Sequence, residues 1–117
     1  MTWYPTDGST AAIWLHFDYT QNVATISFAS AVFDPAKDAI NILKHGISLK
    51  CAEDFDFSTS FIRVDDREDY GELRYRAIGW LDASLFVLVF TQSGENFRAI
   101  SLRSATRQER KQYATKV

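Results

Sequence analysis

The sequence predicts a single α+β domain, in which an antiparallel β-sheet packs against two N-terminal helices and one C-terminal helix. Residues 34–46 carry the start and stop signals of a helix, and beyond residue 60 apolar and polar side chains alternate with a period of two. The last three predicted strands are joined by short turns, which favours antiparallel pairing. A length of 117 residues is typical of one domain and is sufficient for a hydrophobic core.

The N-terminal extension, residues 1–28, is predicted to contain a β-hairpin. Its residues 13–19 and 23–29 alternate apolar and polar side chains on either side of the polar residues 20–22. His16 lies within this alternation and is expected on a strand surface. Because edge strands are commonly shielded, we expect the extension to add edge strands or to cover a sheet face, without catalytic residues.

A helix is predicted between Asp34 and Gly46. Asp34 can accept hydrogen bonds from the first free N–H groups, Pro35 suits the first helical position, and Gly46 suits the left-handed position after the last turn. Spacings of three and four residues predict a core-facing stripe of Ala36, Ile40 and Leu43. The neighbouring polar face holds Lys37, Asn41, Lys44 and His45. A second short helix over residues 49–55 is expected to begin at Ser48 and to bury Leu49, Ala52 and Phe55.

Four strands are predicted next, at residues 61–65, 72–81, 84–92 and 96–104. Residues 85–90 are apolar on both faces, so the third of these strands is expected at the centre of the sheet. At the C-terminal end, Thr106 and Glu109 have the spacing of a capping box, which predicts the start of a basic helix.

Charge is unevenly distributed, although the net charge is only −2. Between residues 53 and 72 eight acids outnumber Arg63 and Arg67, and between residues 98 and 117 six bases outnumber Glu109. Surfaces of opposite charge can steer different partners, although such runs are more often solvated surface. The acidic net charge and the lack of a helix-turn-helix pattern argue against a DNA-binding regulator.

Several kinds of site find no support in the sequence. The single cysteine, Cys51, provides no disulfide or metal cluster and is expected to be a small buried hydrophobe. Metal-ligand spacings, glycine-rich phosphate loops and nucleophile elbows do not occur, so we expect neither a metal nor a cofactor. The longest apolar run has six residues, too short to span a bilayer. With no recognisable signal peptide, the expected location is the cytoplasm, without membrane contact.

The remaining polar residues match the needs of RNA cleavage without a metal: Lys44, His45, Arg74 and Arg103. Histidine titrates near neutrality, and its charged form is favoured at a helix C-terminus, which suits an acid. Arginine holds phosphate oxygens with a two-pronged geometry. Further RNA contacts are assigned to Lys37, Asn41, Tyr75 and Arg107.

Strand alternation predicts how the arginines are arranged. Arg74 and Arg76 are expected on one face of a strand, and Arg98 and Arg103 on opposite faces of the last strand. Simpler interpretations remain open for each candidate. Lys44 and His45 can be a helix end, Arg74 can pair with nearby acids, and Tyr75 can pack in the core instead of stacking on a base.

Three blocks of the sequence resemble, in order and spacing, the BrnT family of type II toxin–antitoxin toxins. They are FDPAKDAINILKHGIS, YGELRYRAIGWLD and VFTQSGENFRAISLRSATRQERKQY, within a toxin core of residues 32–113. The resemblance implies a RelE-like fold, a ribonuclease activity that halts growth by attacking RNA, and neutralisation by a BrnA antitoxin. Because the antitoxin is the DNA-binding partner, operator DNA is expected only as an indirect partner.

The positions matched by the resemblance are Asp34, Pro35, Lys37, Asn41, Lys44, His45, Gly46, Glu72, Arg74, Tyr75, Ser101, Arg103, Ala105 and Thr106. They include all four candidate catalytic residues. The alternative is a catalytically inactive member that only binds antitoxin. The two differ in whether His45 and the arginines converge on one concave surface.

Overall fold

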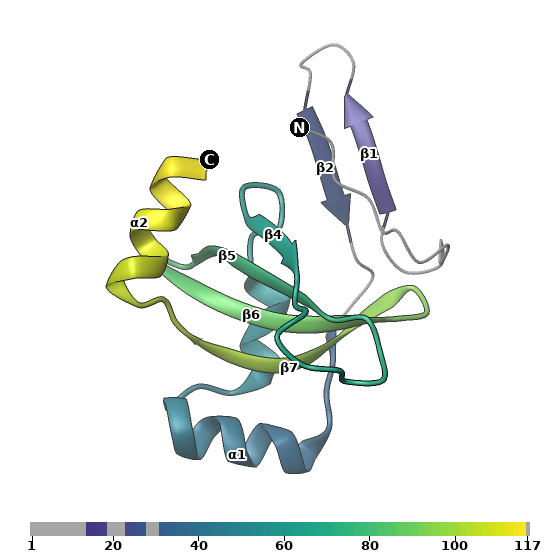
Figure 1. The fold of residues 1–117 in the computed structure, drawn as a ribbon. Helices are drawn as coiled ribbons and strands as arrows, with labels where there is room; N and C mark the ends of the chain where they lie inside the picture. Colours follow the sequence, from purple (N-terminus) through teal and green to yellow (C-terminus); the bar gives the residue numbers. More distant parts are fainter. Residues whose placement is uncertain (1–13, 19–22, 28–30, 117) are drawn as a thin grey trace.

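The computed structural model describes residues 14–18, 23–27 and 31–116 and confirms an α+β architecture (Figure 1). The elements are β1 (Trp14–Asp18), β2 (Val23–Ser27), β3 (Ala31–Val32), α1 (Pro35–His45), the 3₁₀-helix η1 (Leu49–Asp54), β4 (Phe61–Val64), β5 (Tyr75–Leu81), β6 (Ser84–Ser93), β7 (Asn96–Ser104) and α2 (Arg107–Lys116). Five of the strands form one sheet in the order β3-β7-β6-β5-β4.

The predicted antiparallel meander is confirmed, since β5 pairs with β6 and β6 pairs with β7 in antiparallel register. β6 occupies the middle of the sheet, as its apolar sequence predicts. The sheet is nevertheless mixed, because β3 runs parallel to β7. β3 is only two residues long, too short to show an alternating pattern, and the sequence analysis did not predict it.

The N-terminal strands are present, and β1 pairs with β2 in antiparallel register. These two strands form a separate two-stranded sheet. They therefore add no edge strand to the five-stranded sheet. The alternative, that the extension covers a sheet face, stays a prediction, as does its lack of a catalytic role. The turn between them lies outside the described residues, as do the first thirteen residues of the chain.

Both ends of α1 follow the predicted capping chemistry. The carboxylate of Asp34 accepts a hydrogen bond of 2.9 Å from the N–H of Ala36, and Pro35 is the first helical residue. At the other end Gly46 has φ of +72°, and its N–H donates to the carbonyl of Ile42. A residue with a Cβ is strained in this left-handed conformation, which explains why a glycine ends the helix.

The predicted core stripe of α1 is wrong, because Ala36, Ile40 and Leu43 are exposed to solvent. Instead, the buried residue of this helix is Asn41, whose side chain makes three hydrogen bonds to the backbone of residues outside the helix. A polar side chain can be buried when its hydrogen bonds are made. The spacing of apolar residues therefore does not reveal which side of this helix is buried.

The main core lies between the sheet and η1, and α1 contributes no apolar side chain to it. η1 begins at Ser48 and buries Leu49, Ala52 and the following Phe55, as predicted. These side chains pack with sheet residues that include Tyr75, Leu88, Phe90, Phe97 and Leu102. Cys51 is only half-buried and packs against this core.

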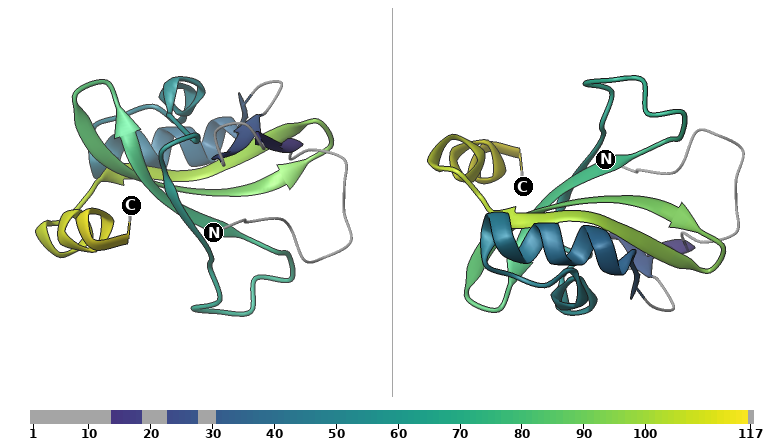
Figure 2. Two further views of the ribbon diagram at one scale, coloured as in Figure 1. Left: turned by 90° about the horizontal axis from the view of Figure 1, so that it is seen from above. Right: turned by 90° about the horizontal axis from the view of Figure 1, so that it is seen from below.

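The opposite face of the sheet is covered in part by α2 and by the loop between β4 and β5 (Figure 2). Ile78, Val87 and Ala105 form a small second core there, with Tyr113 of α2 packed against it. The hydroxyl of Tyr113 donates to the carbonyl of Thr59, 2.8 Å away. One face of the sheet is therefore largely apolar, whereas the other face is only partly apolar.

Candidate functional site

A β-bulge in β7 decides where its two arginines point. Val89 of β6 pairs with Ser101, whereas the next residue, Phe90, pairs with Ala99, so that Ile100 is an extra residue. The alternation of β7 therefore changes phase at Ile100. As a result, Arg98 and Arg103 lie on the same face of the sheet, and the prediction of opposite faces is wrong.

The second face of the sheet carries a row of arginines. Arg103, Arg98 and Arg76 pair with Val87, Thr91 and Val89 of β6. Residues two apart in a strand point to the same side, and Arg63 pairs with Arg76. We call the surface formed by Arg63, Arg74, Arg76, Arg98 and Arg103 the arginine face.

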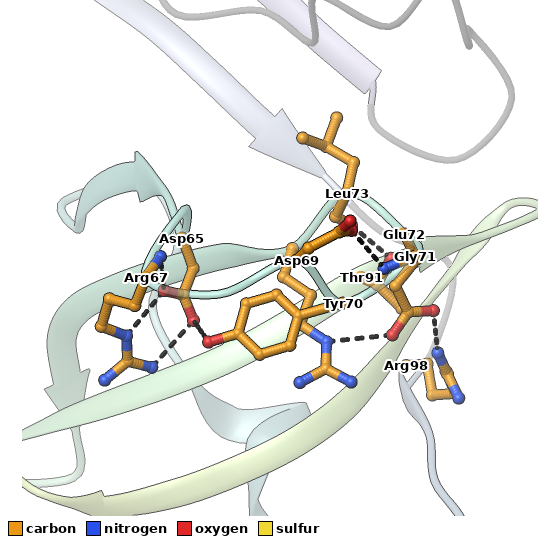
Figure 3. Close-up of polar contacts among 10 residues, drawn as sticks. Asp65, Arg67, Asp69, Tyr70, Gly71, Glu72, Leu73, Thr91 and Arg98 are labelled. Carbon is orange, nitrogen blue, oxygen red and sulfur yellow. Dashed lines mark hydrogen bonds and ion pairs between the residues drawn. The ribbon is translucent and has the colours of Figure 1, made fainter.

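Arg74 joins this face through the carboxylate of Glu72, which also binds Arg98; Figure 3 shows Glu72 beside Arg98. The Nε of Arg74 donates to one oxygen of Glu72 over 3.0 Å, while Arg98 donates to the other oxygen of Glu72. The guanidinium of Arg74 also lies 4.0 Å from the centre of the Tyr70 ring, in a cation–π contact. Glu72 thus holds two arginines from different segments at one point, and pairing of Arg74 with a nearby acid is observed.

The loop that carries Glu72 is itself fixed from both ends. The buried carboxylate of Asp65 accepts hydrogen bonds of 2.7 and 2.8 Å from Arg67, and this pairing holds the pKa of Asp65 below its ordinary value. The hydroxyl of Thr91 donates to the carbonyl of Leu73 over 2.7 Å. The predicted acidic loop is therefore an ordered cover on one end of the arginine face.

Arg103 is held by the predicted capping box of α2. The carboxylate of Glu109 accepts two hydrogen bonds from Arg103, at 2.7 and 2.8 Å, and one from the N–H of Thr106. The hydroxyl of Thr106 accepts in return from the N–H of Glu109, which completes the box. The Arg103 guanidinium lowers the pKa of Glu109 to about 2.

This shift predicts an acid-sensitive contribution to stability. The pKa of Glu109 falls from its ordinary 4.5 to about 2 on folding. The contribution of Glu109 to the free energy of unfolding is therefore complete above pH 4.5 and is lost as the pH falls toward 2. Thermal unfolding of the parent and of Glu109→Gln, followed across this range, checks the prediction. The difference in Tm between the two proteins should shrink with acidification; a constant difference would contradict it.

The Lys44–His45 pair lies beside β7, at a pocket of about 180 Å³. The residues that line this pocket are Lys37, Ile40, Asn41, Lys44, His45, Ile100 and Ser101. Four predicted site residues of α1 are therefore brought together, next to the bulge that sets the arginine face. Two residues further along β7 lies Arg103, which is not among the lining residues.

The remaining predicted RNA contacts differ in exposure. Tyr75 is buried in the main core, where its ring stacks on Phe90 with centroids 5.5 Å apart. It is therefore inaccessible for base stacking, which corrects that assignment. The buried Asn41 reaches the pocket, but both of its N–H donors are bound to backbone carbonyls and its oxygen accepts from one backbone N–H. Arg107, in contrast, is exposed at the start of α2.

A larger hollow of about 580 Å³, which the sequence analysis missed, lies between α2 and the arginine face. Arg76, Glu109 and Lys111 are among its lining residues. The sequence contains one indication of this hollow, because Arg76 is expected on the same strand face as the candidate residue Arg74. Neither Arg74 nor His45 lines this hollow.

These features define a small α+β protein that presents cationic groups, of the kind that bind phosphate, on one sheet face and on the adjoining helix. A family model described as the ribonuclease toxin BrnT of type II toxin–antitoxin systems matches residues 33–109. The chain therefore belongs to the BrnT family of ribonuclease toxins, as its motifs predict, and an antitoxin is its implied partner. A comparison with curated proteins gave no match.

Two further observations concern metals and membranes. Within the described ranges 14–18, 23–27 and 31–116, no cluster of histidine, cysteine and carboxylate side chains could hold a metal ion. None of the helices in the same part of the chain combines the length and the apolar character required to cross a bilayer.

Proposed function

We propose that this BrnT-family protein is a metal-independent endoribonuclease that cleaves RNA through the RNA's own 2′-hydroxyl group and thereby inhibits growth. In this proposal the fold is RelE-like, the protein acts in the cytoplasm, and a BrnA-like antitoxin neutralises it. Operator DNA is reached only through the antitoxin.

The observation that carries the proposal is the gathering of Lys37, Lys44 and His45 around one pocket, beside a sheet face that carries arginines. A histidine supplies a proton donor and acceptor that works near neutral pH. Lysine and arginine supply the positive charge that a phosphorane transition state requires. These groups supply an acid and the positive charge that cleavage by the neighbouring hydroxyl group requires.

In the proposed reaction the 2′-hydroxyl group of the RNA loses its proton to water, and its oxygen attacks the adjacent phosphorus atom. The bond from phosphorus to the 5′-oxygen then breaks. His45 donates a proton to the departing 5′-oxygen, and Lys44 stabilises the negative charge on the phosphorane. Arg74 and Arg103 bind phosphate oxygens, while Lys37 and Arg107 contact the RNA strand. Asn41 supports the site by holding α1 against β7.

Two observations favour the alternative, a catalytically inactive module that only binds antitoxin. No arginine is among the described residues that line the pocket of His45, so the convergence expected of an active member is not seen there. Arg74 and Arg103 are both occupied by carboxylates, Glu72 and Glu109. An RNA phosphate must displace these acids before either arginine can take part in catalysis. The active and inactive alternatives are therefore separated by a direct cleavage assay.

The assay is incubation of the purified protein with RNA and with DNA of the same sequence, with and without EDTA. We expect RNA to be cut in EDTA, leaving a 2′,3′-cyclic phosphate, because the nucleophile belongs to the substrate. DNA should remain intact, since it lacks the 2′-hydroxyl group. Loss of cleavage in EDTA would overturn metal independence, and intact RNA under all conditions would favour the inactive module.

A further inference from the structure

The apolar side of α1 faces solvent. Leu43 is 87% exposed and Ile40 51% exposed, and Ala36 and Ala39 are exposed beside them. Residues three and four apart lie on one side of a helix. The four side chains therefore form a continuous apolar strip, which we call the α1 stripe: Ala36, Ala39, Ile40 and Leu43.

The orientation of the helix is fixed by its opposite, polar side. Asn41 donates to the carbonyls of Ile47 and Leu102 and accepts from the N–H of Leu102, at distances of 2.8 to 3.1 Å. Asp38 accepts from the hydroxyl of Ser48 and the N–H of Leu49, at 2.9 and 2.7 Å. Turning α1 to bury its stripe would break these bonds, so the stripe is held outward.

The α1 stripe is flanked by positive charge. Lys37 and Lys44 are seven residues apart, about two helical turns, and lie along one edge of the stripe. Within the described part of the chain no carboxylate pairs with either lysine. The nearest acid on the helix, Asp38, is turned toward Ser48 and Leu49. A partner that covers the stripe is therefore favoured if it brings acids to this edge.

We propose that the α1 stripe is the docking surface for an amphipathic segment of the antitoxin, whose apolar side chains cover Ile40 and Leu43 and whose acids meet Lys37 and Lys44. Apolar grooves and helix faces are commonly bound by amphipathic helices in this way. The inference rests on the toxin–antitoxin part of the proposed function. It does not depend on whether the protein cleaves RNA.

A second copy of this chain fits the stripe less well. In a two-fold pairing of antiparallel α1 helices, the lysine edge of one copy adjoins the lysine edge of the other. Like charges placed together at an interface disfavour that arrangement. An acidic, amphipathic antitoxin segment would cover the same apolar surface and neutralise the charge of the lysines.

The test compares the affinity of the parent and of Leu43→Glu for the cognate antitoxin by titration calorimetry. A charge in place of the most exposed apolar side chain of the stripe should weaken binding at least about 30-fold, the scale of a hot-spot residue. Because Leu43 is 87% exposed and does not line the pocket, the melting temperature and the rate of RNA cleavage should be unchanged. Val64→Glu is the matched control, since Val64 is an exposed apolar residue at the opposite edge of the sheet.

Parental affinity in Leu43→Glu, or an equal loss in Val64→Glu, would overturn the inference. It would also be overturned if the free protein sedimented as a dimer that Leu43→Glu converts to a monomer, because a second copy would then occupy the stripe. A parent protein that cuts no RNA but loses antitoxin binding on Leu43→Glu would support the docking surface while refuting the ribonuclease proposal.

Discussion

Replacement of His45 by alanine is expected to slow RNA cleavage by about 10²–10⁴-fold, the usual contribution of a positioned acid or base. His45 ends α1 and lines the pocket beside Ser101. Single-turnover cleavage of RNA measures the effect.

Lys50→Ala is the matched control for this substitution. Lys50 is an exposed base close to the end of α1 but does not line the pocket, so its removal should leave cleavage nearly unchanged. If His45→Ala cleaved RNA as fast as the parent, Lys44 and His45 would be only the end of a helix.

Replacement of Asn41 by alanine is expected to destabilise the protein on the order of 3 kcal/mol, because each buried polar group left unpaired costs about 1–3 kcal/mol. The substitution removes the partner of the Leu102 N–H and of two carbonyls, those of Ile47 and Leu102. It also releases α1, so that Lys44 and His45 lose their position beside β7. Urea unfolding measures the stability, and the cleavage rate of the folded variant reports the position of the helix.

Lys37→Ala provides the comparison, since Lys37 lies on the same helix with an exposed side chain. Its effect on unfolding should remain within about 0.5 kcal/mol, as for most surface substitutions. An equal stability of Asn41→Ala and the parent would show that water replaces the lost hydrogen bonds without cost.

Much of the fold is predictable from local signals. Asp34, Pro35 and Gly46 delimit α1 because each residue satisfies a specific backbone requirement at a helix end. Thr106 and Glu109 do the same for α2. The central position of β6 follows from side chains that are apolar on both faces.

Features that depend on non-local contacts were not predictable. The orientation of α1 is decided by Asn41, whose partner Leu102 lies 61 residues away in the sequence. The common face of Arg98 and Arg103 depends on one extra residue, Ile100, in the register with β6. Alternation counts residues along a single strand, so it cannot anticipate a bulge.

The candidate site was predictable in part. The pattern of α1 identified Lys37, Lys44 and His45, which line one pocket. It did not indicate that Arg103 is bound by Glu109, or that Arg74 shares Glu72 with Arg98. Base stacking is expected of Tyr75 because its side chain is aromatic, whereas Ala77 and Leu81, on the same face of β5, are buried with it in the core.

The sharing of Glu72 by two arginines has a consequence for the thermodynamics of RNA binding. A cationic surface normally attracts a strand because salt ions are released into solution, and the affinity then falls steeply with ionic strength. At Arg74 and Arg98 the ion that leaves is a carboxylate of the protein itself, which stays tethered. When a phosphate replaces this carboxylate, fewer salt ions are released into solution than when a phosphate binds an unpaired arginine. If RNA binds at this point of the arginine face, as proposed, its affinity should be less sensitive to salt than the number of arginines implies.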